Sequence, residues 1–412
     1  MEKVEIPESE VASLEIVRQL LPWRDLLKGG FGTAHGNAQL ELTDVLIVLL
    51  AAFFNPMVRS QRLIEALSSQ QWMQDKHGIR RVPRSTLSDA LKRFDPAVLK
   101  PLIGQLAARI PALARRDSDL AAVTRQIVAA DGTYLNLAGE VAWSLLSRRG
   151  RGPKVQARVR LDFQLDIETF APLEVQVCGG DQGSEPLALL KHLRPDVIYL
   201  VDRGYVSFAL LEGLLAAGSN FVMRLKKDVG FEPREQRALC PRDVELDIRR
   251  DEVGILPGPK SKGNDDLRSY TCPPPAATLR RVSVWDAKNK SEVILLTDML
   301  DLPAAVIAEL YRRRWVIELF FKWLKCYAGF DHAISQSPRG LTLQFYVAVI
   351  GTLLLHLATG RPVSKYAVFW LHAVASGQAT WQEMQAGLAR IEREKALEND
   401  RRARKKAQKQ LV

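Results

Sequence analysis

The chain has 412 residues, of which 47% are hydrophobic and 25% are charged, and its formal net charge is +11. This length allows two or three domains with a sizeable core, and the composition is that of a soluble globular protein rather than a disordered one. The positive charge favours a polyanionic partner, with nucleic acid ahead of an acidic membrane surface. The four cysteines form no C-x-x-C pair, so we expect neither a zinc site nor a disulfide framework, as in a reducing cytosol.

The N-terminal part of the chain is predicted to be helical. An apolar helix is predicted from the N-cap Thr43 to Phe54 and ends at Asn55-Pro56, and a basic helix with Ser85 as its N-cap is predicted within residues 82–94. The basic helix fits either the recognition helix of a helix-turn-helix-like bundle or an ordinary surface helix, and the sequence does not separate the two. The apolar run at 341–358 contains polar residues and is predicted to be a buried core helix, so we expect no membrane association.

From about residue 124 the pattern changes to strands alternating with helices. One strand alternates strictly between polar and apolar residues. Lys154, Arg158 and Arg160 share one face, so the pattern predicts one buried face and one strongly basic face. The order predicts a mixed α/β sheet. Its strands are expected at 126–130, 154–161, 170–178, 197–201 and 220–225.

Residues 227–300 interrupt this order. Pro and Gly are frequent there, and short strands are predicted at 244–248, 281–285 and 293–297. We therefore expect a β-rich insertion in the sheet domain. A helix without Pro or Gly follows at 311–325, and the C-terminal end is helical and charged.

The helix at 311–325 gathers polar groups on one face. Steps of three, four and seven residues place Tyr311, Arg314, Glu318 and Lys325 on that face, and Lys322 lies one turn beyond Glu318. A carboxylate among cations can hold a metal ion against a nucleic-acid backbone. A solvated row of i, i+4 ion pairs would look the same in the sequence.

Two further carboxylates stand where open α/β sheets carry their chemistry. Asp131 and Asp202 each end an apolar strand, with the turn residues Gly132 and Gly204 close behind. Each alone is typical of a turn or a helix cap. Together with Glu318 they suit phosphoryl transfer on divalent ions, for which hard oxygen ligands favour Mg²⁺, with Mn²⁺ as a substitute. Asp162, Asp166 and Asp181 lie mid-strand or in loops and lack this setting.

These three segments resemble the three motif regions of the IS4-type insertion-sequence transposases. The helix matches that family's Y-(2)-R-(3)-E-(6)-K signature at every fixed position, and the Asp, Asp, Glu order agrees. The resemblance covers about residues 124–330. It implies an α/β fold with a ribonuclease-H-like mixed-sheet catalytic domain at 123–330 and a β insertion at 227–300. An all-α domain at 1–122 would bind DNA ends, and a helical region at 331–412 would serve dimerisation and DNA contacts.

The resemblance also implies roles for individual residues. Asp131, Asp202 and Glu318 would be the catalytic, metal-binding triad. The expected DNA contacts are Tyr311, Arg314, Lys325, Lys322 and Arg203, together with Trp285, which would stack a flipped base.

The implied activity is metal-dependent cut-and-paste transposition on double-stranded DNA. Its steps would be strand nicking, hairpin formation and opening at the terminal inverted repeats, and transfer to target DNA by a homodimer in the cytoplasm, at the nucleoid. Two alternatives remain open: a ribonuclease-H-like nuclease without strand transfer, and a catalytically silent DNA-binding protein derived from a transposase.

Overall fold

The structure is a computed structural model in which the chain divides into two compact units. Unit 1 comprises Met1–Arg109 and Trp323–Val412, and unit 2 comprises Ile110–Lys322. The N-terminal and C-terminal helices therefore share one unit, while the predicted boundaries at 122 and 330 stay predictions. The residues described are 40–55, 58–71, 74–75, 81–111, 120–121, 123–136, 145–148, 155–179, 183–227, 229–257, 273–327, 333–375 and 377–410.

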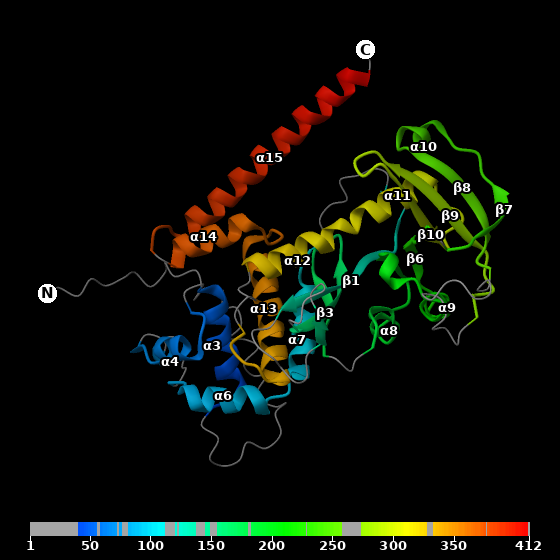
Figure 1. Ribbon diagram of the computed structural model, residues 1–412. Helices are drawn as coiled ribbons and strands as arrows, with labels where there is room; N and C mark the ends of the chain where they lie inside the picture. Colours follow the sequence, from blue (N-terminus) through cyan, green and yellow to red (C-terminus); the bar gives the residue numbers. More distant parts are fainter. Residues whose placement is uncertain are drawn as a thin grey trace. The chain divides into compact units, whose positions relative to one another are not determined.

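Unit 2 is built on one mixed sheet, in the order β2-β3-β1-β5-β6-β10-β9-β8-β7, with β4 paired to β3 (Figure 1). β5 runs parallel to both β1 and β6, and the other ladders are antiparallel. The mixed α/β prediction is thus confirmed. The strands among the described residues are β1 Gln126–Asn136, β2 Leu145–Arg148, β3 Val155–Asp166, β4 Pro172–Cys178, β5 Val197–Val201, β6 Asn220–Leu225, β7 Glu232–Gln236, β8 Ile248–Ile255, β9 Leu279–Asp286 and β10 Ser291–Thr297.

Three predicted details of the sheet differ from the structure. β1 does not stop at Asp131 but continues to Asn136, because it pairs with β3 beyond the point where it leaves β5. The strand predicted at 244–248 is instead the helix α10, Pro241–Glu245, followed by β8. The prediction of an exposed basic face on β3 is wrong at Arg160, whose side chain is buried and paired with Asp162. Lys154, which was predicted on the same face, lies outside the described residues.

Helices complete unit 2 on the sheet. α9 (Phe208–Ala216) buries Leu211 and Leu214 in a core that also contains Tyr199 and Phe221 from β5 and β6. Every residue of β5 is buried, which agrees with its all-apolar sequence and its central position. The remaining helices are α8 (Glu185–Leu190), the short 3₁₀ turn η4 (Arg203–Tyr205), α11 (Ala304–Arg313), which contacts β6, β8, β9 and β10, and α12 (Trp315–Tyr327).

Unit 1 is helical and is organised around α13 (Pro338–Thr359), which contacts α3, α6 and α7. A Cβ atom on Gly351 would lie 2.5 Å from the ring of Phe53, so the glycine allows this close approach. α13 is the one helix of the described residues that is long and apolar enough to cross a membrane, but 78% of its most apolar window is buried, which confirms the predicted core helix. The other helices are α3 Leu42–Phe54, α4 Gln61–Ser68, α6 Arg84–Arg93, η2 Pro96–Leu99, α7 Lys100–Ala108, α14 Lys365–Ala375 and α15 Trp381–Gln410.

Burial of His356 in α13 links the stability of unit 1 to pH. Burial lowers the pKa of this imidazole from 6.5 to about 4. Between these two values the unfolded chain binds a proton that the folded chain does not, so the free energy of unfolding falls as pH drops from 6.5 towards 4. We predict that His356→Gln loses stability less steeply over this range than the wild type, measured by urea unfolding at each pH. An equal pH dependence in both proteins would contradict the prediction.

Candidate active site

Parallel pairing of β1 with β5 brings the two strand aspartates to the same edge of the sheet. The ladder aligns Gln126 with Val197 and ends with Ala129 opposite Leu200. Asp131 and Asp202 follow two positions later on each strand, so they keep the same alignment. Neighbouring strands lie about 4.8 Å apart, so the two aspartates continue adjacent strands in the same direction, although they are far apart along the chain.

The segment that carries the signature residues is two helices rather than the single helix expected. α11 ends at Arg313 and α12 begins at Trp315, with Arg314 between them. At this point the backbone closes with i→i+3 bonds, since Arg314 N donates to Tyr311 O (3.0 Å) and Ile317 N donates to Arg314 O (3.0 Å). Glu318 lies in the first turn of α12, where the helix dipole favours a carboxylate.

Arg314 joins two of the three predicted acids. Its Nη1 lies 3.1 Å from Asp131 Oδ2 and 3.4 Å from Glu318 Oε1. The guanidinium is buried, and burial alone would lower its pKa, but the surrounding negative groups, Asp202 among them, raise it. The i, i+4 pair with Glu318 that the sequence left open is therefore present, and it belongs to a larger charged cluster.

The third acid is held from the same segment. Tyr311 Oη donates a hydrogen bond to Asp202 Oδ1 (3.0 Å), and Arg224 Nη1 lies 3.9 Å from the same oxygen. Burial raises the pKa of Tyr311 to about 12, and the negative charge of Asp202 adds to this effect. The phenol therefore stays protonated and is a constant donor to Asp202.

Electrostatics at Asp131 show that the cluster needs a positive partner. Burial raises the pKa of Asp131 from 3.8 to about 7; Arg314 opposes this rise, whereas Glu318 and Glu185 add to it. Carboxylates that lie this close repel one another in their ionised forms. A cation among them removes the repulsion, and in this structure that cation is the guanidinium of Arg314.

The residues therefore fit a divalent metal ion by their chemistry. The candidate ligands are carboxylate oxygens, which Mg²⁺ and Mn²⁺ prefer. In the structure the guanidinium of Arg314 supplies the positive charge that a metal ion would bring. Its Nε is buried and has no hydrogen-bond partner in the described part of the chain, so the side chain is held by its terminal nitrogens alone. Among the described residues, no group of three His, Cys, Asp or Glu is already arranged to hold a metal, because Arg314 lies between the acids.

The sequence analysis missed a second layer of charge behind Asp131. Asp162 accepts three hydrogen bonds from Arg160: Nε donates to Oδ1 at 2.9 Å and to Oδ2 at 3.1 Å, and Nη2 donates to Oδ2 at 3.0 Å. Glu185, the first residue of α8, lies against the glycines near both aspartates: a Cβ on Gly132, within β1, would be 2.8 Å from its Oε1, and a Cβ on Gly204, after β5, would be 3.6 Å from its Oε2. The alternation of β3 places Arg160 and Asp162 on one face and could have revealed that pair. No local signal indicates Glu185.

Within the described residues, no hydrogen bond or ion pair joins the remaining predicted DNA contacts to these acids. Trp285 is half-exposed on β9, opposite Glu292 at the start of β10. The pairing of Ile294 with Leu225, the last residue of β6, places that end of β10 at the sheet edge where Asp131 and Asp202 lie. Arg203 and Lys322 are exposed in unit 2, and Lys325 is exposed in unit 1. Their roles as DNA contacts stay predictions.

Crowding at Gly132 leads to a test of this second layer. A Cβ at this position would also lie 2.9 Å from Asp162 Oδ1, and Arg160 holds that carboxylate in place. We predict that Gly132→Ala lowers the free energy of unfolding by about 1–3 kcal/mol, as overpacking does. Gly104→Ala is the matched control, because a Cβ there meets nothing within 4 Å. Urea unfolding of both variants measures the difference, and equal stabilities would refute the crowding.

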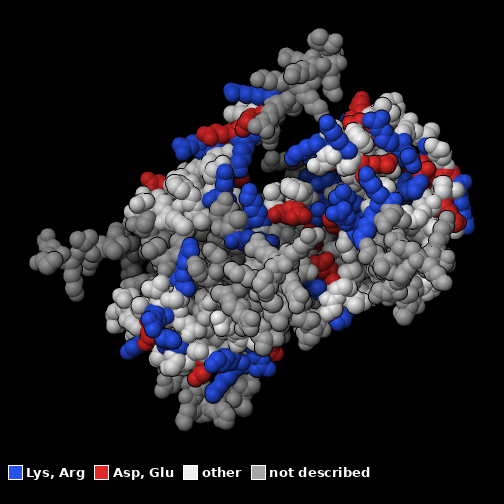
Figure 2. All heavy atoms as spheres, viewed as in Figure 1, with Lys and Arg blue, Asp and Glu red and all other residues white. Residues whose placement is uncertain are grey.

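On the face drawn in Figure 2, Lys and Arg side chains gather over α11 and the neighbouring strands of unit 2, with Asp and Glu among them. The positive charge of the chain is thus concentrated partly around the segment that carries the signature residues. An anionic polymer is the ligand that such a surface attracts.

Comparison with known proteins identifies the domain. Residues 124–354 match the family model described as a transposase DDE domain. Among curated proteins, a putative transposase for insertion sequence element IS4SA of Synechocystis is 37% identical over 283 residues, 66% of this chain and 71% of that protein.

Two further relatives are more distant in sequence. The putative transposase y4zB of Sinorhizobium fredii is 26% identical over 272 residues, 66% of this chain and 70% of that protein. A probable transposase for insertion sequence element IS5377 of Geobacillus stearothermophilus is 21% identical over 296 residues, 69% of this chain and 72% of that protein. The matched family model covers both strand aspartates and Glu318, and the chain belongs to the insertion-sequence transposases with a DDE domain.

Proposed function

We propose that this transposase moves its element by a cut-and-paste reaction in which Asp131, Asp202 and Glu318 hold divalent metal ions. The proposal is supported by the contacts that Arg314 makes with Asp131 on β1 and Glu318 on α12, and by Asp202, next after β5, whose negative charge also acts on Arg314. Enzymes of the DDE family use divalent ions. The oxygen donor set supports Mg²⁺, with Mn²⁺ as its substitute. We also assign unit 2 a ribonuclease-H-like arrangement, which is supported by its mixed sheet with the parallel strands β1, β5 and β6 side by side.

Bound metal would supply the activation of the attacking oxygen and the stabilisation of the leaving oxygen in an in-line phosphoryl transfer. Side chains of the protein would orient the acids and bind the phosphate. Tyr311 donates to Asp202 and fixes its orientation. Arg314, once released from Asp131 and Glu318, has two terminal nitrogens that can bind a phosphate. Asp131, whose pKa burial raises to about 7, would hold a divalent ion in its ionised form.

The same chemistry supports the full sequence of steps. Water cuts one strand at the element end and frees a 3′-hydroxyl. This hydroxyl attacks the opposite strand and forms a hairpin, a second water opens the hairpin, and the 3′-end then attacks target DNA. Every step is a phosphoryl transfer that needs positioned charge and no covalent protein intermediate.

Partners follow from this reaction. The substrate is double-stranded DNA carrying the terminal inverted repeats, and a second DNA serves as target. Two ends must be held together, so a homodimer forms on the DNA. The proposed contacts to phosphates are Tyr311, Arg314, Lys322, Lys325 and Arg203, with the helices of the N-terminal region on the element ends. The enzyme acts in the cytoplasm, on the nucleoid.

Glu318→Gln tests the catalytic assignment. This change keeps the size of the side chain but removes its charge, so we predict that cleavage of an element-end duplex falls by at least roughly a hundredfold, while duplex binding in the absence of metal is retained. The measurement is nicking with Mg²⁺ and with Mn²⁺. A precut end is added as a second substrate, because a nuclease without strand transfer forms no joined product from it. Normal cleavage by Glu318→Gln would remove the triad proposal.

Trp285 provides a separate test of the hairpin step. If its ring stacks a flipped base, Trp285→Ala loses about 1–3 kcal/mol of stacking. We therefore predict slower hairpin formation with first-strand nicking unchanged, and partial recovery in Trp285→Phe. Denaturing gels resolve nicked and hairpin products. Equal loss of both products in Trp285→Ala would argue for a structural role in β9 instead.

A further inference from the structure

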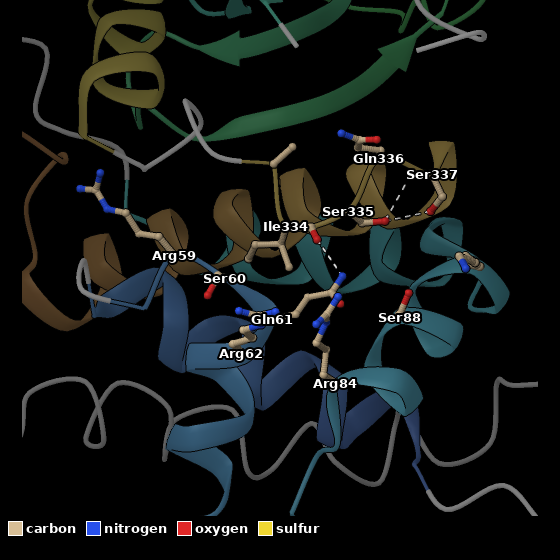
Figure 3. Close-up of a pocket in the computed structure, with 12 residues that line it drawn as sticks. Arg59, Ser60, Gln61, Arg62, Arg84, Ser88, Ile334, Ser335, Gln336 and Ser337 are labelled. Atoms are coloured by element: carbon tan, nitrogen blue, oxygen red, sulfur yellow. Dashed lines mark hydrogen bonds between the residues drawn. The ribbon is translucent and has the colours of Figure 1, made fainter. Parts of the chain in front are cut away.

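A groove in unit 1 collects basic side chains and takes no part in the site described above. Twelve described residues line it, and its volume is about 550 Å³. Four of these residues are cations, four are serines, and none of the twelve is acidic or aromatic. Figure 3 shows Arg59 and Arg62 coming from the start of α4, Arg84 and Ser88 from α6, and Ser335 from the segment before α13.

One face of α6 supplies a regular row of donors to this groove. Arg84, Ser88 and Lys92 are four residues apart and so lie on the same side of the helix. The adjoining side of the helix buries Leu87, Ala90 and Leu91 in the unit. Eight residues of helix extend about 12 Å, which matches roughly three to four nucleotides of a DNA strand at 3.4 Å each.

The charges of this row are not neutralised by neighbours. Arg62 and Arg84 are exposed, and within the described residues no ion pair involves either of them. Lys92 Nζ lies 3.9 Å from Asp89 Oδ1, and both side chains are more than half exposed, so this pair is weak. Figure 2 shows Lys and Arg side chains gathered over α6. The groove therefore offers a positive field to an anionic ligand.

Hydrogen bonds fix the walls of the groove in place. Gln61 Nε2 donates to Ile334 O (2.8 Å), which ties α4 to the segment before α13. Ser337 Oγ donates to Leu91 O (3.4 Å), and Arg339 Nη1 donates to Arg93 O (3.1 Å), which tie that segment to the end of α6. A preformed groove needs little ordering when its ligand binds.

We infer that this groove binds the phosphodiester backbone of DNA, with Arg62, Arg84 and Lys92 on successive phosphates and the Ser88 hydroxyl between them. The inference rests on the proposed function, which makes DNA the substrate, and it adds a binding site in unit 1. Hydroxyls and cations without a stacking ring suit phosphates rather than base edges. The groove thus positions DNA and does not select its sequence.

The salt dependence of DNA binding tests this site. Each lost phosphate contact makes the slope of log K against log [salt] shallower by about one. We predict that Arg62→Gln/Arg84→Gln makes the slope shallower by about two. A fluorescein-labelled 30-base-pair duplex serves as the probe, read by anisotropy in EDTA. Arg109→Gln, which changes an exposed cation of unit 1 outside the groove, leaves the slope unchanged.

Two substitutions at Ser88, with opposite expected effects on DNA binding, separate a change at the groove from damage to the fold. Ser88→Lys adds a cation to the row and makes the slope steeper by about one, whereas Ser88→Asp weakens binding. Thermal unfolding of each variant confirms that it is folded. Wild-type slopes in both Arg62→Gln/Arg84→Gln and Ser88→Lys would overturn the inference. So would binding of inorganic phosphate that is lost in Arg62→Gln/Arg84→Gln while the DNA slope stays unchanged, because the groove would then hold a small anion only.

The groove proposal and the catalytic-triad proposal can each be refuted without the other. These slopes are measured without metal and do not depend on catalysis, while cleavage by the wild type with Mn²⁺ and its loss in Glu318→Gln report on the triad alone. Normal cleavage chemistry together with unchanged slopes would reject the groove and keep the transposase mechanism. Altered slopes together with cleavage that does not need Glu318 would keep the groove and reject the triad.

Discussion

Charge balance around Arg314 is the constraint on which the candidate site depends. Asp131 and Glu318 both bind its terminal nitrogens, and Asp202 contributes to the negative field around it. Without a cation, burial and mutual repulsion would keep Asp131 protonated near neutral pH. The sheet edge can therefore hold its acids close together only while a positive group lies among them. In this structure a guanidinium from the signature segment meets this need.

Much of the sheet domain is predictable from the sequence because apolar runs and their period are local signals. The all-apolar β5 is predicted at its observed bounds, and outside the sheet domain the buried α13 is predicted close to its bounds. The continuation of β1 past Asp131 was not, because it depends on pairing with β3. The break at Arg314 was also missed, since a switch to i→i+3 bonding has no Pro or Gly to mark it.

The second charged layer shows where sequence reasoning stops. Asp162 looked like an ordinary strand residue, and its meaning comes from Arg160 beside it and from Glu185 on a different element. Arg160 was predicted to face solvent because alternation gives the faces of a strand but not what covers them. In the structure β4 pairs alongside β3, Asp162 neutralises the guanidinium, and Arg160 is buried. Burying this arginine requires the paired acid.

The spacing of the signature follows from the geometry of helix against sheet. Tyr311 binds Asp202 after β5, and Arg314 binds Asp131 on β1. Three residues of helix rise about 4.5 Å, and neighbouring strands are about 4.8 Å apart. A donor pair at i, i+3 thus reaches two adjacent strands when the helix crosses them. Glu318, one turn further on, then reaches the same guanidinium, so the gaps of the motif match the strand spacing and the helical pitch.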